Sequence, residues 1–449
     1  MGRLRFVLAI VLVLLGAGDS VVLAQSLVQR VGNFDGHPVE VWTVPNDRGG
    51  NEYFVLALPS GPGPHPVIVF VDPYTVLPCG PSSNPEDCLW NSYARQGGPF
   101  YDISLRPEWN FRPCDGGACE VPVSGVATDL SDLRRLADFS MNGSNNASWA
   151  LAHGYAVAIA FARHYAARDT ITVVLGIVNT LEALQRLPQV DANRMAILGR
   201  SQGGELAIHA LAFPGRPLNL AASVAEAGWA DGRDMTDYAY RALPSAQPAG
   251  LYEVSKNFFN GFWNRLAAGF GADENGPLWG YLSRDYVAEV RTTPTLVIAG
   301  TDDAFVPATE SERFYNALRD RGKDALKWIW QNGSAPLQSL SVQSIGHGAM
   351  DTNSAWKREA LWRLFILNRM PSGARVTVRV PQDLDLVSAY NELAKIVKTG
   401  SSRDTENAYA LASLLGNPLV CYESSDPRVP SGCGDTVHPY MLRSLFGIQ

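Results

Sequence analysis

The sequence predicts an α/β protein in which a mostly parallel, doubly wound sheet carries two inserted segments. Short continuous apolar runs, rich in β-branched residues, are typical of strands that are buried on both faces. Segments with helical periodicity lie between these runs, and alternating strands and helices build parallel sheets that are covered on both sides. Two long aromatic-rich stretches interrupt the alternation, so we expect them to be lid-like insertions.

The expected sheet has an edge hairpin followed by buried strands. Residues 26–57 alternate apolar and polar side chains between Gly and Asn turns, which favours strands at a sheet edge. The buried runs are residues 66–71, 155–161, 194–199, 220–224, 294–300 and, less purely, 338–345. The helical segments are residues 170–187, 203–212, 309–321 and 354–370.

The domain organisation follows from these elements. Residues 25–370 are expected to form one domain, with insertions at about 73–148 and 229–286, and residues 371–449 a C-terminal accessory segment. Both insertions begin where a predicted strand ends. Because open α/β sheets bind ligands beyond the carboxyl ends of their strands, we expect the insertions to cover the ligand site.

Residues 1–24 have the pattern of a signal peptide. Arg3 and Arg5 precede a short apolar run, and small residues suited to a signal peptidase follow it. An uncleaved N-terminal anchor is the alternative, although the run is short for a bilayer span. We therefore expect a secreted or periplasmic protein that has no membrane contact after cleavage.

The six cysteines lie in three sequence-near pairs, which suggests local disulfides in an exported chain. Zinc is the competing interpretation, but the spacings lack paired CxxC units and no histidine lies nearby at ligand spacing, so no metal site is predicted. The sequence alone does not decide the connectivity. The near pairs are Cys79 with Cys88, Cys114 with Cys119, and Cys421 with Cys433.

Composition excludes some classes of function. With 46% hydrophobic and 18% charged residues, the chain is an ordinary globular protein rather than a disordered or fibrous one. Its formal charge is −7 and it has no basic run, so a nucleic-acid partner is not expected. The oligomeric state does not follow from these features.

Residues 199–203 form a Gly-x-Ser-x-Gly motif between a buried strand and a helical segment. That context is the one a nucleophile elbow requires, because the serine lies on a sharp turn whose neighbours must lack bulk. Ser201 is therefore the predicted nucleophile. The N–H of Gln202 then lies at a helix N-terminus, where it can donate to an oxyanion.

A serine hydroxyl needs a base, and His347 is the predicted one among the seven histidines. It follows the last strand-like run and precedes a long helix, and it comes after the serine in the chain, as the order serine, acid, histidine requires. His164 follows the strand that ends at residue 161 but precedes the serine. It is therefore a candidate substrate contact, and Trp229, in the second insertion, is another.

The acid of the triad is expected at a strand end between Ser201 and His347, where it can orient the imidazole. Asp303, in the segment 300–307, is the predicted acid. Asp302 is interpreted as a turn-forming residue. Glu226, just beyond the strand that follows the elbow, is an alternative acid.

From about residue 66 to 370 the chain resembles α/β-hydrolases related to prolyl oligopeptidases and dienelactone hydrolases. In those enzymes Gly-x-x-Asp-x-x-Val-Pro carries the acid and Gly-His-Gly the base, and both motifs stand here at residues 300–307 and 346–348. Residues 71–74, Val-Asp-Pro-Tyr, also resemble the Asn-Pro-Tyr turn of cocaine esterases and X-prolyl dipeptidyl peptidases. That resemblance implies that Tyr74 completes the oxyanion hole.

The sequence therefore predicts a secreted serine hydrolase that cleaves a carboxylic ester through an acyl-enzyme, without a metal or organic cofactor. The expected substrate is a small-molecule or polymeric ester, with an apolar or aromatic portion that faces the aromatic-rich insertions. A secreted serine peptidase is the alternative within the same fold. A hydrolase-fold binding protein without catalysis is the alternative of another class, and it would require a missing triad member.

Overall fold

The computed structural model describes residues 25–45, 51–72, 141, 145–161, 170–238, 280–301, 303, 306–330, 355–372, 376–380, 386–417, 420–424, 431–434, 439 and 443. All structural statements below concern these residues.

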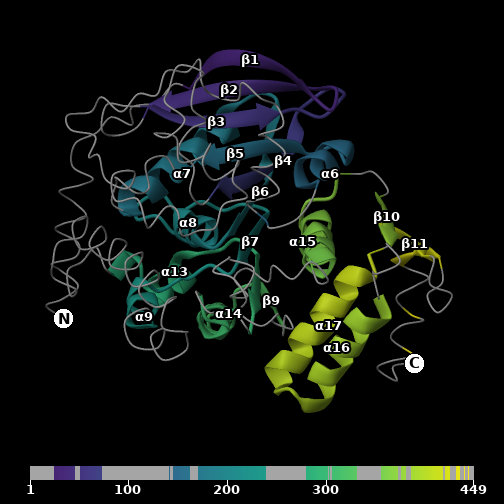
Figure 1. Cartoon of the computed structure of the whole chain (residues 1–449). Coiled ribbons are helices and arrows are strands. Elements are labelled where there is room, and N and C mark those ends of the chain that lie inside the picture. The colour runs from purple at the N-terminus through teal and green to yellow at the C-terminus, as the bar shows by residue number, and fades with distance from the viewer. Residues whose placement is uncertain are drawn as a thin grey trace, which may run out of the picture.

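A nine-stranded mixed sheet forms the centre of the molecule, with the strand order β1-β2-β3-β5-β4-β6-β7-β8-β9 (Figure 1). The first three strands pair antiparallel at one edge, and β4 to β9 pair parallel with one another. The strands are β1 Ser26–Phe34, β2 His37–Pro45, β3 Asn51–Ala57, β4 His65–Asp72, β5 Ala156–Phe161, β6 Val190–Arg200, β7 Ala222–Glu226, β8 Thr295–Gly300 and β9 Ala325–Trp330.

Most of the predicted strands are confirmed, including the antiparallel edge at residues 26–57. The sheet also contains one strand that the sequence analysis did not anticipate. This strand is β9, whose apolar run is interrupted by Lys327. The predicted strand at residues 338–345 lies outside the described residues. The end of the sheet beyond β8 is therefore formed by a strand that the hydrophobic pattern alone did not reveal.

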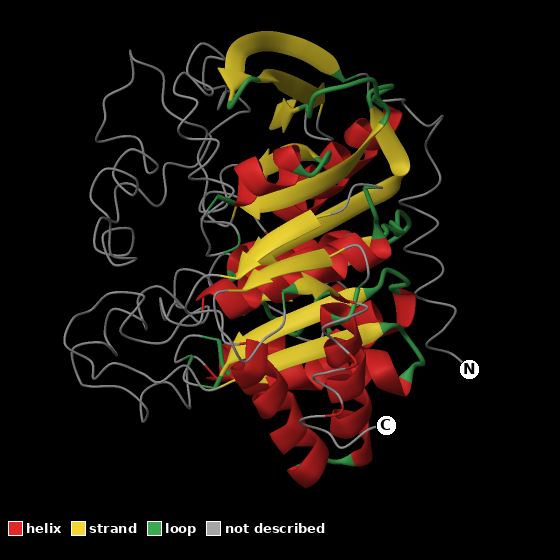
Figure 2. Ribbon diagram, turned by 90° about the vertical axis from the view of Figure 1, so that its right-hand side faces the viewer, coloured by secondary structure: helices red, strands yellow, loops and turns green. Residues whose placement is uncertain are grey.

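Both faces of the sheet are covered by helices (Figure 2). Neighbouring residues of one strand enter different hydrophobic clusters: Phe70 packs in the cluster that contains α15, and Val69 packs in the cluster that contains α7 and α8. Burial on both faces explains why these strands read as continuous apolar runs. The covering helices are α6 Asn146–Ala152, α7 Thr170–Arg186, α8 Gln202–Ala210, α13 Arg284–Val290, α14 Ala308–Asp320 and α15 Ala355–Arg369.

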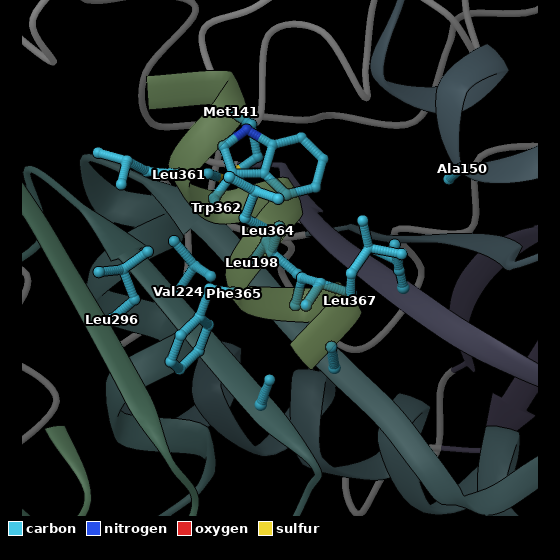
Figure 3. Packing of buried hydrophobic residues seen from close by; sticks show 14 of the residues in the cluster. Met141, Ala150, Leu198, Val224, Leu296, Leu361, Trp362, Leu364, Phe365 and Leu367 are labelled. Atoms are coloured by element: carbon cyan, nitrogen blue, oxygen red, sulfur yellow. The ribbon is translucent and has the colours of Figure 1, made fainter. Parts of the chain in front are cut away.

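The α15 helix closes one face of the sheet. Its side chains Trp362 and Phe365 are completely buried and lie over the strands that carry Leu198 and Val224 (Figure 3). The Trp362 ring meets the Phe70 ring of β4 edge-on, with 6.2 Å between ring centroids. This aromatic contact joins a helix near the end of the predicted main domain to one of the central strands.

The C-terminal segment contributes to the same core. Its helices α16 Leu386–Thr399 and α17 Ser402–Leu415 supply buried residues to the cluster that contains α15. A separate three-stranded sheet follows, made of β10 Val376–Val380, β11 Val420–Ser424 and β12 Gly432–Cys433. Of the three predicted disulfides, Cys421–Cys433 is present between β11 and β12, and the other four cysteines lie outside the described residues.

Among the helices that the structure describes, none is both long and apolar enough to cross a membrane. The predicted signal peptide at residues 1–24 and most of the two predicted insertions fall outside the described residues.

Asn407 of α17 covers the exposed edge of the sheet. Its side-chain oxygen accepts a hydrogen bond from the Lys327 N–H at 2.9 Å, and its side-chain nitrogen donates to the Lys327 carbonyl at 2.9 Å. The amide thus occupies the place of a further strand beside β9 and satisfies backbone groups that an edge strand leaves open.

Replacing Asn407 by alanine should destabilise the protein by about 2 kcal/mol, because a buried Lys327 N–H and carbonyl lose their partners. The free energy of urea unfolding measures this effect. The matched control is Glu406→Gln in the same helix, where the side chain is 64% exposed and its ion pair with Arg319 should contribute about 1 kcal/mol or less. Equal losses in the two variants would contradict the edge-covering role.

Candidate active site

The carboxyl ends of the parallel strands meet at one edge of the sheet. Asp72 of β4 lies beside Phe161 of β5, and Arg200 of β6 lies beside Glu226 of β7. Glu226 in turn lies beside Ile298, two residues before the end of β8. The segments that follow β6, β7 and β8 carry the predicted site residues that the structure describes, which are Ser201, Gln202, Trp229 and Asp303.

Ser201 has the backbone conformation of a nucleophile elbow. Its φ and ψ are 54° and −123°, and it stands between the last residue of β6 and the first residue of α8. A non-glycine residue at positive φ is strained and persists only where the surrounding structure holds it. The side chain is 4% exposed. The turn therefore presents the hydroxyl at the carboxyl edge of the sheet.

The glycines of the motif allow strand and helix to pass close together. A Cβ on Gly199 would lie 2.2 Å from the backbone oxygen of Gly203, a distance that no side chain tolerates. One residue further, a Cβ on Gly204 would lie 3.0 Å from the Cα of Gly228 in the segment after β7. Gly199 excludes a larger residue for a steric reason, as the sequence analysis expected for the motif, and Gly204, just beyond the motif, leaves little room for one.

The segment after β7 holds the elbow in place. The N–H of Ser201 donates to the carbonyl of Glu226 at 2.8 Å. Ala227 is itself at positive φ, 47°, and its N–H donates to the carbonyl of Ile298 in β8 at 2.8 Å. A Cβ on Gly228 would lie 2.7 Å from the backbone carbon of Gly204, so this segment packs directly on the start of α8.

Gln202 is the first residue of α8 and is 1% exposed. The first N–H groups of a helix have no acceptor within the helix, and the helix dipole places partial positive charge there. This position suits the predicted oxyanion donor, whose role stays a prediction.

Asp303 follows β8 in a tight turn. Its N–H donates to the carbonyl of Gly300 at 3.2 Å, and its Oδ1 accepts from the N–H of Val306 at 2.9 Å. The residue is 5% exposed. Burial and, to a smaller extent, the nearby negative charge of Asp303 raise the pKa of Tyr238 to about 12, so the phenol and the carboxylate lie close together.

Glu226, the alternative acid, is placed differently. It is completely buried at the end of β7, where it stands beside Arg200 in register. Asp303 is in the turn beyond the next strand, which is where the sequence analysis expected the acid. Asp302 lies outside the described residues.

The histidines that the structure describes lie away from the carboxyl edge or are held neutral. His65 begins β4 at the opposite edge, and His153 follows α6 before β5 begins. His209, two turns along α8 from Ser201, is 4% exposed, and burial, together with the positive charge of Arg291, lowers its pKa to about 3. None of these replaces His347 as the predicted base; His347, His164 and Tyr74 lie outside the described residues.

Trp229 and Glu205 were not paired by sequence reasoning, yet they meet beside the elbow. Trp229 is 5% exposed and belongs to the hydrophobic cluster of α7 and α8, so its predicted substrate contact would have to be made from a largely buried ring. Burial raises the pKa of Glu205 well above its usual value, an effect that the Trp229 side chain partly opposes. A glutamate within the apolar face of α8 was the sequence signal for a carboxyl group whose pKa burial raises.

No group of three or more His, Cys, Asp or Glu side chains among the described residues could hold a metal ion.

A family model of acetyl xylan esterases, AXE1, matches residues 134–225, which include Ser201. No curated protein sequence matches the chain. Three of the similar solved structures are an acetyl xylan esterase from Paenibacillus sp. R4 (14% identity, 70% of this chain, 83% of that chain, TM-score 0.40), esterase B from Lactobacillus rhamnosis (12%, 83%, 94%, 0.43) and an acylaminoacyl peptidase from Pyrococcus horikoshii (16%, 80%, 43%, 0.38).

Because all three TM-scores are below 0.5, the fold assignment rests on the strand order, the elbow and the family match. The chain has an α/β-hydrolase fold, as predicted. The match to an esterase family supports a carboxylic ester hydrolase, with peptidases as the related alternative.

Replacing Gly228 by alanine should lower kcat by about 10²-fold, because the new methyl group would displace the start of α8 and with it Ser201. Ester turnover and thermal unfolding measure the two consequences. Gly280→Ala is the matched control, since a Cβ there would meet nothing within 4 Å. Unchanged kcat in the Gly228 variant would show that the elbow does not depend on this contact.

Proposed function

We propose that the chain is a secreted serine hydrolase that cleaves a carboxylic ester through a covalent acyl-enzyme, with Ser201 as nucleophile, His347 as base and Asp303 as orienting acid. The single observation that carries the proposal is the positive φ of Ser201 at the junction of a buried strand and a helix. A strained serine at that junction is the mark of a nucleophile elbow. The family match to esterases supports the same reaction class.

In this mechanism His347 takes the proton of Ser201 as the hydroxyl attacks the carbonyl carbon of the ester. The N–H of Gln202 and the side chain or N–H of Tyr74 stabilise the oxyanion of the tetrahedral intermediate. Asp303 orients the imidazole and stabilises its protonated form. His347 then protonates the leaving alkoxide, and water, activated by the same histidine, releases the acid product.

An acetyl ester is the first substrate to test, because the family that matches residues 134–225 is one of acetyl xylan esterases. The aromatic residues of the predicted insertions favour an ester with an apolar or aromatic portion. A panel of acyl esters that varies the acyl and alcohol parts separately distinguishes these preferences.

The peptidase alternative loses one of its supports. An exopeptidase that binds a free amino terminus usually needs a carboxylate for the ammonium group, and Asp231, in the second predicted insertion, is an acidic residue that could supply one. Its Oδ1 accepts from the N–H groups of Arg233 and Asp234, each at 3.1 Å, and its Oδ2 accepts from the N–H of Arg284 at 3.2 Å. Asp231 therefore serves as a helix cap and a backbone tie.

Export is part of the proposal. The Cys421–Cys433 disulfide is typical of proteins that fold in an oxidising compartment. The residues that precede position 25 have the pattern of a signal peptide. N-terminal sequencing of the mature protein tests this part.

A fluorophosphonate probe should label Ser201, and the Ser201→Ala variant should lose the label together with at least about 10³-fold of ester turnover. Asp303→Asn should lower kcat by about 10³- to 10⁴-fold, because the imidazole loses its orientation. The probe should still label Ser201 in this variant, but at a lower rate. Mass spectrometry locates the label, and a panel of esters and aminoacyl anilides measures turnover.

Turnover of anilides in preference to esters would favour the peptidase. Glu226→Gln is the control for the acid, and a larger loss there than in Asp303→Asn would move that role to Glu226. Absence of both labelling and turnover would contradict the proposed function.

A further inference from the structure

Five charged side chains from three helices form one network, here called the neck cluster: Asp231 and Asp234 at the start of α9 (Gly232–Asp237), Arg284 of α13, and Glu310 and Arg313 of α14. Nη1 of Arg284 lies 2.7 Å from Oδ2 of Asp234 and 4.0 Å from Oε2 of Glu310. Nη1 of Arg313 lies 3.1 Å from Oδ2 of Asp234 and 3.1 Å from Oε1 of Glu310.

The neck cluster stands at the base of the second predicted insertion. The N–H of Gly232 donates to the carbonyl of Leu282 at 3.0 Å, and the N–H of Arg284 donates to Oδ2 of Asp231 at 3.2 Å. These bonds join the chain segment that enters the insertion to the segment that leaves it. Glu310 and Arg313 then tie both segments to α14.

The same cluster borders the segment that carries the proposed acid. The α14 helix begins directly after the Asp303 turn: Val306 donates to Asp303 at 2.9 Å, and the N–H of Glu310 donates to the carbonyl of Pro307 at 2.9 Å. The other end of α9 leads to Tyr238, whose pKa responds to the charge of Asp303. Near its start α9 is therefore ion-paired with α14 through Asp234 and Arg313, and at its end the charge of Asp303 acts on Tyr238.

The hydrogen bonds of the cluster leave Glu310 as the carboxyl group with the fewest partners. Asp231 accepts three backbone N–H bonds, and Asp234 accepts from both guanidinium groups. Glu310 is 2% exposed, and its Oε2 has no hydrogen-bond partner. With three carboxyl groups and two guanidinium groups, the cluster is neutral only when one carboxyl group carries a proton.

Electrostatics agrees with this geometry. Burial raises the pKa of Glu310 to about 7, and the charges of Asp234 and Asp231 raise it while those of Arg284 and Arg313 lower it. A buried carboxyl group with a raised pKa stabilises the fold at low pH, and that stability is lost as the pH rises through the folded-state pKa.

We propose that Glu310 is a positioning residue for the Asp303 segment. Neutral Glu310 leaves Arg284 engaged with Asp234 and holds α14 against the base of the insertion. Ionised Glu310 competes for both guanidinium groups and shifts the start of α14, together with the Asp303 turn that precedes it. The inference rests on the proposed role of Asp303, and it makes turnover depend on a second ionisation besides that of the catalytic histidine.

The test compares Glu310→Gln with the wild type between pH 5.5 and 8.5. Glutamine mimics the neutral acid, so the two proteins should have similar Tm and kcat at pH 5.5. At pH 8.5 the wild type should have a lower Tm than the variant. The kcat of the variant should then be about threefold or more above that of the wild type, with KM unchanged. The ratio of the two kcat values cancels the ionisation of the histidine, which both proteins share.

Glu312→Gln is the matched control on the same helix, because the Glu312 side chain is 44% exposed and lies 3.7 Å from Nζ of Lys327. The ratio of its kcat to that of the wild type should not change with pH. Adding Asp234→Asn to both proteins removes the carboxylate that raises the pKa of Glu310, so the step in the ratio should move to lower pH.

A kcat ratio that does not change between pH 5.5 and 8.5 would overturn the positioning role, whether or not Tm changes with pH. An equal change of the kcat ratio in the Glu312→Gln control would overturn it as well. Labelling of Ser201 by the fluorophosphonate probe is measured on the same samples. Absent labelling in the wild type would count against the proposed function, while the Tm comparison still reports whether Glu310 titrates.

Discussion

The strained backbone of Ser201 is the constraint on which the rest of the site depends. A positive φ in a non-glycine residue costs about 1–3 kcal/mol, and Ala227 on the neighbouring segment carries the same kind of strain. The two positions are linked, because the N–H of Ser201 bonds to Glu226, the residue before Ala227. Burial of the central strands on both faces supplies the stability that holds this arrangement, and glycines at 199, 204 and 228 remove the atoms that would prevent it.

The carboxyl edge of the sheet concentrates charge, and each charged group is held in a different way. Asp303 is held by the Val306 N–H of its own turn, burial raises the pKa of Glu205, and Glu310 shares two arginines with Asp234. Helix α9 is ion-paired with α14 through Asp234 and Arg313, and it ends at Tyr238, whose pKa the charge of Asp303 raises.

The last third of the chain stabilises one face of the sheet and its outer strand β9. Helices α15, α16 and α17 cover one face, and Asn407 replaces a missing neighbour along β9. An uncovered strand edge invites pairing with other chains, so this amide protects the sheet as well as stabilising it. Strand β9 pairs parallel with β8, and the Asp303 turn starts at the end of β8.

The sequence by itself determined the alternation of strands and helices, the elbow at Ser201 and the position of Asp303 just beyond a strand, because each depends on residues that are close together in the chain. Periodicity and glycine spacing are local signals, and the strands at 66–71, 194–199 and 294–300 were predicted from them. The tertiary structure alone decided that Lys327 lies in an edge strand and that Asn407 covers it, since these residues are far apart in the sequence. It also decided the raised pKa of Glu205 and the shared arginines of Glu310, because burial and the charges of other helices, not neighbouring residues, set the pKa of a carboxyl group.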